Sequence, residues 1–200
     1  MTALRTITPS ALAAILASHA LWLADDPAGT HADLSYANLR CANLSGVDLS
    51  GADLSGGDLR CANLCYADLR GAKLRGVNLS DSNLRYANLP GVKLWRANLS
   101  GVDLSGADLT GVDLTGATLR GADLTGASMR AANLIDANLS GTCLIDGGAD
   151  PRGYRFVGLD TADGRRVFAG CRDYTLAEAR DHWANNPDAL ARVEIIAAAP

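Results

Sequence analysis

The chain has 200 residues, enough for one domain or two small ones, and its formal net charge is −4. Its 18 Lys and Arg against 22 Asp and Glu indicate neither a general nucleic-acid binder nor a strongly acidic tail. Aromatic residues make up only 5% of the chain, so other side chains must fill the core. No apolar run is long enough to span a membrane, so no membrane partner is expected.

Residues 1–31 are expected to form an N-terminal helical cap and a linker. Thr8 followed by Pro9 is typical of a helix N-cap and first helical position. The apolar positions that follow share one helical stripe: Leu12, Ile15, Leu16, His19, Trp22 and Leu23. Because such stripes are usually core, His19 and Trp22 are expected to pack on the neighbouring structure.

A five-residue repeat dominates the middle of the chain. Leucine recurs at every fifth position from Leu34 to Leu144, and the 23 members include one substitution, Met129. Two residues earlier lies a small residue, which is Ala in 15 repeats and Val in five. One residue earlier lies Asp or Asn in 18 repeats, and two residues later lies Gly in 13. The consensus is Ala-(Asp/Asn)-Leu-x-Gly, without an insertion from residue 32 to 146.

Neither regular secondary structure explains this period. An α-helix would spread the leucines around its surface, and a plain strand would send alternate leucines to opposite faces. A turn after every pentapeptide removes both problems, because four pentapeptides then close a square coil. The leucine and the small residue point inward, Gly accepts positive φ at the corner, and coils stack about 4.8 Å apart with parallel pairing. The 23 repeats correspond to about 5.75 coils and a rod about 28 Å long.

The motif A(D/N)LXX in residues 32–146 resembles that of the pentapeptide-repeat family and covers 115 of 200 residues. The resemblance implies a right-handed quadrilateral parallel β-helix, the shape that packing also predicts. It implies a protein that binds partners and performs no chemistry.

Residues 147–200 are expected to form a small α+β module. Residues 154–157 and 166–169 predict a hairpin with its turn at Asp163–Gly164. Thr175 and Glu178 form a capping-box pattern for a helix to about residue 183, and Asn186–Pro187 starts a second helix to about residue 196.

The role of this module stays open. It resembles C-terminal modules of some bacterial and phage-encoded pentapeptide-repeat proteins. Because a repeat rod needs covered ends, a C-terminal cap is favoured over a separate docking module.

No catalytic site is evident. The three histidines, His19, His31 and His182, lie near the two ends of the chain, and none neighbours a Ser or Cys in a nucleophile pattern. Phosphate-loop, GxSxG and HExxH motifs are absent. The repeated Asp and Asn are explained by hydrogen bonding in turns. We therefore expect no enzyme activity, no cofactor and no metal.

The five cysteines favour free thiols and a reducing compartment, hence the cytoplasm. The apolar N-terminus is interrupted by polar residues, so no cleaved signal is expected. Cys61 and Cys65 lack companion metal ligands. Cys41 and Cys61 are one coil apart at equivalent corners, with Cα atoms expected about 5 Å apart. Because their side chains would run parallel, we expect a ladder rather than a disulfide.

Residues twenty apart should stack, which sorts the outward side chains by face. Residues 70–96 carry a net charge of +5, from four Arg and two Lys against one Asp. They contain the candidate partner patch: Lys73, Arg75, Lys93, Trp95 and Arg96. Trp95 is expected under Arg75 as a cation–π pair. Residues 97–128, at net −3, contain the alternative acidic patch: Asp103, Asp108, Asp113 and Asp123.

Two further stacks are expected on another face. Tyr66 and Tyr86 should stack on each other. Asn43, Asn63 and Asn83 should form an amide ladder.

Three functions stay open. The first is a non-enzymatic interaction scaffold with an unidentified protein partner. The second follows from the resemblance alone, because family members that confer fluoroquinolone resistance resemble duplex DNA and act on type II topoisomerases such as DNA gyrase. A DNA mimic needs a continuous negative surface. The positive band formed by residues 70–96 interrupts such a surface, so the interaction scaffold is favoured over the DNA mimic. The third is a structural component of a larger assembly. Direct nucleic-acid binding is not expected.

Overall fold

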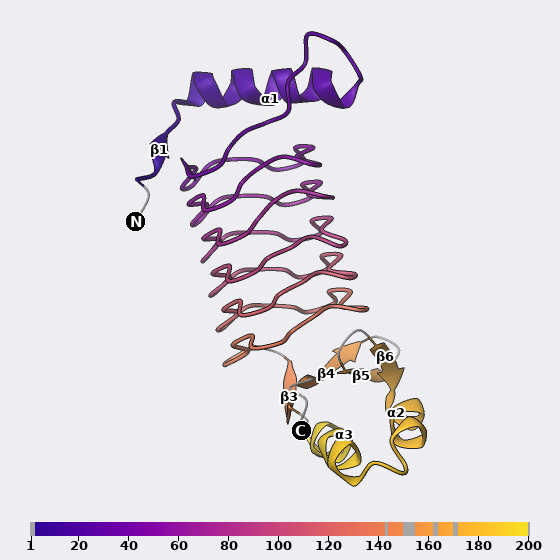
Figure 1. Ribbon diagram of the computed structural model, residues 1–200. Helices are drawn as coiled ribbons and strands as arrows, with labels where there is room; N and C mark the ends of the chain where they lie inside the picture. Colours follow the sequence, from indigo (N-terminus) through magenta and orange to yellow (C-terminus); the bar gives the residue numbers. More distant parts are fainter. Residues whose placement is uncertain (1–2, 143, 150–154, 162–163, 170–171, 200) are drawn as a thin grey trace.

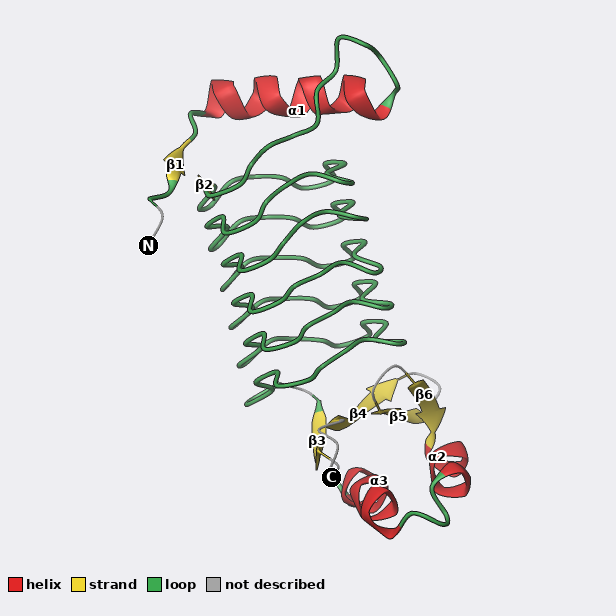
Figure 2. Cartoon of the chain, viewed as in Figure 1, coloured by secondary structure: helices red, strands yellow, loops and turns green. Residues whose placement is uncertain are grey.

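The computed structural model describes residues 3–142, 144–149, 155–161, 164–169 and 172–199. A long stack of coils occupies the middle of the chain, with a helix across one end and a small module at the other (Figure 1). Most of the stack consists of turns and single β-bridges, so Figure 2 draws it largely as loop. The elements in chain order are β1 (Arg5–Thr6), α1 (Pro9–Leu23), β2 (Ala37–Asn38), β3 (Ile145–Ala149), β4 (Arg155–Thr161), β5 (Gly164–Ala169), β6 (Arg172–Thr175), α2 (Leu176–His182) and α3 (Pro187–Ala198).

The coils pair with each other in parallel at a spacing of twenty residues. The bridges run without a break in register from Asp33 with Asp53 to Thr118 with Asn138. Hydrogen bonds alternate along each rung, as where Leu44 N donates to Asn63 O at 2.7 Å and Asn63 N donates to Ala42 O at 2.9 Å. The fold is therefore a repeat β-helix, and pentapeptides four apart share a face.

The leucine series fills the interior of the stack. Every member from Leu34 to Leu144, Met129 included, is at most 7% exposed. Most small residues two positions earlier are also buried, where coil backbones approach each other. Ser82 holds one of these positions, and its hydroxyl is satisfied because it donates to Leu79 O at 2.6 Å. The inward assignment of both repeat positions is confirmed.

The corners adopt left-handed backbone conformations. Thirteen corner glycines have φ between 64° and 75°, and nine other corner residues have φ between 53° and 60°. These nine are Tyr36, Cys41, Cys61, Tyr66, Asp81, Tyr86, Arg96, Ala131 and Asp136. Several lean over the corner of the next coil: a Cβ on Gly106 would lie 2.4 Å from the Tyr86 ring. Glycine at such a corner thus permits the positive φ and leaves room for the side chain above.

Replacing Ala131 by glycine should raise the free energy of unfolding by about 1 kcal/mol, because Ala131 has φ 57° and a left-handed conformation strains any residue with a Cβ. The matched control is Ala132→Gly, since Ala132 is buried at 3% exposure and its methyl group packs in the core. Urea unfolding of both variants checks the expectation. If both variants lose stability, the strain argument fails.

The N-terminal segment contacts the first coils. Thr8 caps α1, accepting from Ala11 N at 3.2 Å, as predicted. His19 is fully buried, and its Nδ1 accepts from Ala32 N at 3.2 Å. Its ring stacks on Trp22 at 5.4 Å, and His31 meets Trp22 edge-on at 5.1 Å. His19 thus packs as expected, whereas Trp22 keeps 40% exposure.

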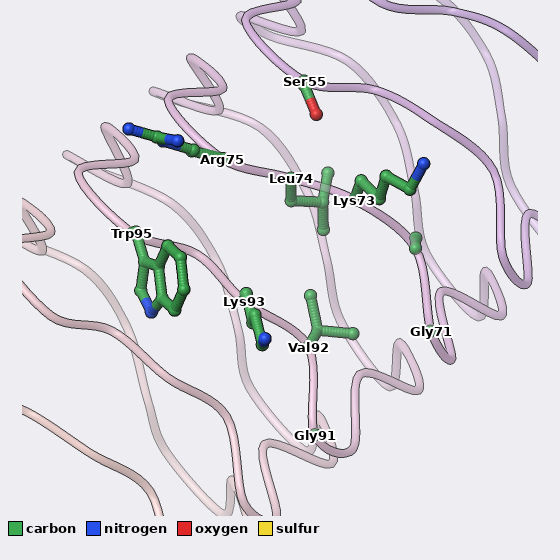
Figure 3. A pocket seen from close by; sticks show the side chains of 10 residues that line it. Ser55, Gly71, Lys73, Leu74, Arg75, Gly91, Val92, Lys93 and Trp95 are labelled. Atoms are coloured by element: carbon green, nitrogen blue, oxygen red, sulfur yellow. The ribbon is translucent and has the colours of Figure 1, made fainter.

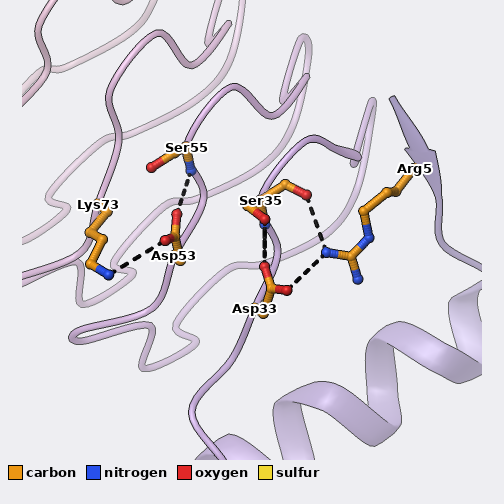
Figure 4. A network of polar contacts seen from close by, with 6 residues as sticks. All are labelled: Arg5, Asp33, Ser35, Asp53, Ser55 and Lys73. Atoms are coloured by element: carbon orange, nitrogen blue, oxygen red, sulfur yellow. Dashed lines mark hydrogen bonds and ion pairs between the residues drawn. The ribbon is translucent and has the colours of Figure 1, made fainter. Parts of the chain in front are cut away.

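A short strand before α1 was not predicted. In β1, Arg5 pairs with Ala37 of β2 in parallel register, which extends the ladder beyond the first coil. Arg5 Nη1 donates to Asp33 Oδ2 at 3.1 Å and to Ser35 O at 3.3 Å (Figure 4). A strand of two residues carries no periodicity, so the sequence could not reveal it.

Acidification should destabilise the N-terminal contact through His19. Burial lowers the pKa of His19 below its ordinary value of 6.5, and the charge of His31 lowers it further. The folded state therefore takes up the proton less readily than the unfolded state, so stability is full above about pH 6.5 and falls as pH drops toward the folded pKa. The midpoint temperature of thermal unfolding should decrease as pH is lowered from about 8 to about 5. The variant His19→Gln should lose much of this decrease.

His182→Gln is the control, because His182 is exposed on α2. Acidic residues with lowered pKa values lose their contribution only below about pH 4, so they do not mask this window. An equal pH dependence in wild type and His19→Gln would refute the assignment.

The C-terminal residues form an antiparallel sheet of order β3-β4-β5-β6. The predicted hairpin corresponds to β4 and β5, which pair from Phe156 with Ala169 to Thr161 with Gly164. Tyr154 and Asp163 of that prediction lie outside the described residues. Strands β3 and β6, which flank the hairpin, were not predicted. Their sequences, with paired glycines in β3 and charged residues in β6, do not alternate as strands usually do.

The two faces of this sheet serve different cores. Val157 is fully buried and belongs to the same apolar cluster as the leucine stack. Val167 lies opposite Gly158, the residue after Val157, and so faces the other side. It packs in a second cluster with residues of α2 and α3 such as Ala179 and Val193.

Both helix starts in this module are confirmed. Thr175 N donates to Glu178 Oε2 at 2.7 Å, and Glu178 N donates back to Thr175 Oγ1 at 3.2 Å. Asn186 caps α3 by accepting from Ala189 N at 3.2 Å. Of the helices in the described ranges, none is long and apolar enough to cross a membrane.

Candidate partner-binding face

One face of the coil stack carries the residues of the predicted partner patch. Its ladder, one residue per coil, consists of Asp33, Asp53, Lys73, Lys93, Asp113 and Asn133. We call this the lysine face. Each ladder residue is followed by the buried leucine of its pentapeptide, and the two residues after that leucine also belong to the face. Arg75 and Trp95 thus lie on it, and Arg96 occupies the corner at its edge.

The two lysines depart from the local pattern of the repeat. At most other ladder positions, Asp or Asn accepts a hydrogen bond from the backbone N–H two residues on, as in Ser55 N to Asp53 Oδ1 at 3.0 Å. A lysine has no acceptor, so Lys73 and Lys93 forgo this turn bond. They also pair directly with each other in the ladder, where like charges are unfavourable. Positions that break a local rule are where function is sought first.

Acidic neighbours flank the lysine pair. Lys73 Nζ lies 3.5 Å from Asp53 Oδ2 (Figure 4). On the other side, Asp113 pairs with Lys93 in the ladder. Burial raises the pKa of Asp113, but hydrogen bonds from Thr115 and Trp95 and the charge of Lys93 outweigh it, so the pKa lies below its ordinary value. Asp113 is therefore ionised at neutral pH.

The cation over Trp95 is Lys93, and the predicted pairing of Trp95 with Arg75 is wrong. Lys93 Nζ lies 5.0 Å from the centroid of the Trp95 ring. Lys93 and Trp95 leave the same coil on the same side, two residues apart, whereas Arg75 belongs to the preceding coil and extends away from the indole (Figure 3). Arg75 and Arg96 are exposed, and neither forms an ion pair with a described residue.

A hollow of about 450 Å³ opens on the lysine face between neighbouring coils. Its floor consists of backbone and small or apolar residues, and its rim consists of cations and the indole (Figure 3). The lining residues are Ser55, Gly71, Ala72, Lys73, Leu74, Arg75, Gly91, Val92, Lys93 and Trp95. Such a site suits an anionic group attached to an apolar or planar one.

A family model for pentapeptide repeats matches this chain with eight copies between residues 30 and 146. The matched residues make up more than half of the chain. The chain belongs to the pentapeptide-repeat family.

Solved structures resemble this pentapeptide-repeat protein over part of its length. They include a thylakoid-lumen protein of Arabidopsis thaliana (36% identity, 48% of this chain and 70% of that one, TM-score 0.40). HetL of Nostoc sp. strain PCC 7120, involved in heterocyst differentiation regulation, shares 35% identity over 57% of this chain and 60% of its own (TM-score 0.26). QnrB1, a plasmid-mediated fluoroquinolone resistance protein, shares 26% identity over 60% of this chain and 61% of its own (TM-score 0.34).

These likenesses leave the function of this pentapeptide-repeat protein open. The chain spans less than two thirds of the length of HetL and QnrB1, and all three TM-scores are below 0.5. No curated protein matches it.

The predicted positive band of this pentapeptide-repeat protein is divided among its faces. Arg70 lies on another face, paired with Asp68 at 2.7 Å. Arg85 lies on a third face, 3.9 Å from Asp103. Because these charges are matched locally, the cations of residues 70–96 that form no ion pair with a described residue are Arg75, Lys93 and Arg96, which lie on the lysine face or at its edge.

The alternative acidic patch is not one surface, and this prediction needs correction. Asp103 and Asp123 stack on one face, Asp108 lies on a second, and Asp113 lies on the lysine face. A step of five residues moves to the next face, and only residues twenty apart stack. Each of the four also accepts a hydrogen bond from the backbone N–H two residues on, as where Thr125 N donates to Asp123 Oδ1 at 2.9 Å, so these carboxylates stabilise the turns.

The tyrosine stack is confirmed, and the asparagine ladder is confirmed as a side-chain bond between Asn43 and Asn63. Tyr66 and Tyr86 stack with ring centroids 5.1 Å apart and are 64% and 49% exposed. Asn63 Nδ2 donates to Asn43 Oδ1 at 3.3 Å, and Asn63 pairs with Asn83 in the ladder.

Sequence reasoning missed Asp53 beside Lys73 and the apolar floor of the hollow, and it assigned Asp113 to the acidic patch instead of to a place beside Lys93. The signal was available, because both carboxylates lie twenty residues from a lysine. Within the described ranges, no group of three His, Cys, Asp or Glu side chains is placed to hold a metal.

Proposed function

We propose that this chain is a non-enzymatic interaction protein of the cytoplasm that binds an acidic segment of a partner protein on its lysine face. The observation that carries the proposal is the stacked pair Lys73 and Lys93, two cations that replace the favoured Asp or Asn in adjacent coils. Neither lysine can accept the hydrogen bond of the turn, and the two ammonium groups repel each other. A bound anion would offset this loss of stability. Arg75 and Arg96 add exposed guanidinium groups, and the hollow beside Trp95 accepts an apolar side chain.

In this proposal, residues 32–146 form about 5.75 right-handed, four-sided coils that present a flat, rigid face. Residues 1–31 and 147–200 cover the two ends. The contacts of His19 with Ala32 and the burial of Val157 beside the leucine stack support such caps. Because the lysine face is rigid, binding requires little further ordering of this chain, which favours affinity.

Charge reversal tests the lysine face. The variant Lys73→Glu, Arg75→Glu, Lys93→Glu and Arg96→Glu should lose partners that the wild type captures from a lysate, because carboxylates then face the acidic segment. The control replaces Arg40, Arg85, Arg120 and Arg130 by Glu. These four arginines lie on the other faces, so the control has the same net charge as the test variant. It should retain those partners, and capture by the wild type should weaken as salt rises.

The outcome separates the alternatives. Identical capture by all three proteins would reject the lysine face as the binding surface. Recovery of topoisomerase subunits, with inhibition of DNA gyrase supercoiling that survives charge reversal, would favour a DNA mimic instead. Absence of any partner would favour a structural role in a larger assembly.

A further inference from the structure

The sequence Leu-Arg-Cys-Ala-Asn-Leu occurs twice, at residues 39–44 and 59–64. The two copies are twenty residues apart, so they occupy the same edge of adjacent coils. Cys41 and Cys61 lie at equivalent corners with φ of 55° and 57°. Both thiols are free and exposed. The repeated sequence therefore places two thiols at equivalent corners of adjacent coils.

The backbone holds these corners one coil repeat apart. Leu39 N donates to Asp58 O at 2.8 Å before the corner, and Leu44 N donates to Asn63 O at 2.7 Å after it. At the corner itself, Cys41 N donates to Arg60 O at 2.9 Å. The corner spacing is thus the usual strand separation of about 4.8 Å.

This spacing suits a bridging ion better than a disulfide. Parallel Cβ atoms about 4.8 Å apart exceed the separation of about 3.5–4.5 Å that a disulfide requires. Two metal–sulfur bonds of about 2.3 Å each, arranged in a line, span about 4.6 Å. Two thiolates on adjacent rungs therefore match a linear two-coordinate site without movement of the backbone.

The number of ligands selects the ion. No group of three His, Cys, Asp or Glu side chains that could hold a metal occurs in the described part of the chain. A structural zinc site takes four such ligands. Soft thiolates with low coordination number instead select Cu(I).

The local charge also fits. A Cu(I) ion with two thiolates carries one net negative charge, and an arginine precedes each cysteine. Arg60 is paired with Asp58 at 2.5 Å, whereas the exposed Arg40 side chain forms no ion pair with a described residue. Arg40 is thus available to balance the complex.

We propose that Cys41 and Cys61 bind one Cu(I) ion as a linear bis-thiolate bridging two coils. Binding replaces two S–H bonds with two S–Cu bonds and releases two protons, without any change of oxidation state. The site is independent of the lysine face, which lies on another side of the rod.

The test is titration of the reduced full-length protein with Cu(I) under anaerobic conditions, in competition with the chromophoric chelator bicinchoninate. We expect removal of one copper equivalent from the chelator, with affinity that falls as pH is lowered. Either Cys41→Ser or Cys61→Ser should weaken binding by more than the roughly 10–100-fold that loss of an outer-shell partner causes. Zn(II) should not bind the site with comparable strength.

Cys65→Ser is the matched control, because Cys65 is a free thiol on a neighbouring face and should leave binding unchanged. The double variant Cys143→Ser and Cys171→Ser excludes the two cysteines outside the described residues and should also retain copper. Far-UV circular dichroism verifies that each variant folds. Copper binding that survives loss of Cys41 or Cys61, or that disappears in either control, overturns the proposal.

Discussion

Replacing Leu84 by alanine is expected to lower the free energy of unfolding by about 3–4 kcal/mol, because it opens a cavity in the middle of the leucine stack. Leu84 is fully buried, and its coil neighbours Leu64 and Leu104 are at most 1% exposed. The rungs on both sides fix the backbone, as where Leu84 N donates to Asp103 O at 2.7 Å. The coils therefore cannot collapse into the space, which places the loss toward the upper part of the usual range.

Urea unfolding followed by far-UV circular dichroism measures this effect. Leu21→Ala is the control, because Leu21 is 42% exposed on α1 and its loss should cost less than about 0.5 kcal/mol. Repeat rods can unfold in parts, so the midpoint and the slope of the transition are compared together. Similar losses in both variants would show that the leucine stack does not carry the stability of the rod.

Replacing Val157 by aspartate is expected to destabilise the last coils by at least about 3 kcal/mol, because it places a carboxyl group in an apolar core without a partner. Val157 is fully buried in the cluster that contains Leu139 and Leu144. If residues 147–200 act as a cap, the substitution should separate the sheet from the rod and expose its end. Hydrogen exchange of backbone amides in residues 119–139 should then accelerate, while amides near residue 60 stay protected.

Two further variants interpret that result. Val167→Asp places the same charge in the separate core shared with α2 and α3, so exchange should accelerate first within the module. Ile195→Asp, at a position 49% exposed on α3, should change neither region. Unchanged exchange in residues 119–139 of Val157→Asp would mean that the module does not cap the rod. A docking role would then be favoured.

The sequence by itself determined the coil stack. A leucine at every fifth position can be buried on one side only if the chain turns after each pentapeptide, so period, interior and corners follow from one pattern. The same counting predicted that Tyr66 and Tyr86 stack and that Cys41 and Cys61 share a corner. Helix starts at Thr8, Thr175 and Asn186 were also readable, because capping depends on a few adjacent residues.

Only the tertiary structure decided which charges remain unmatched and where the ends make contact. The contacts of a long side chain depend on the direction in which it extends as well as on its position in the chain. For this reason Lys93 rather than Arg75 lies over the Trp95 ring. The strand β1 forms because the first coil leaves an unpaired edge, and its own two residues carry no pattern. Val157 and Val167 read alike in the sequence, yet strand register sends them to different cores. Pairing between distant segments, which local sequence does not encode, made each of these choices.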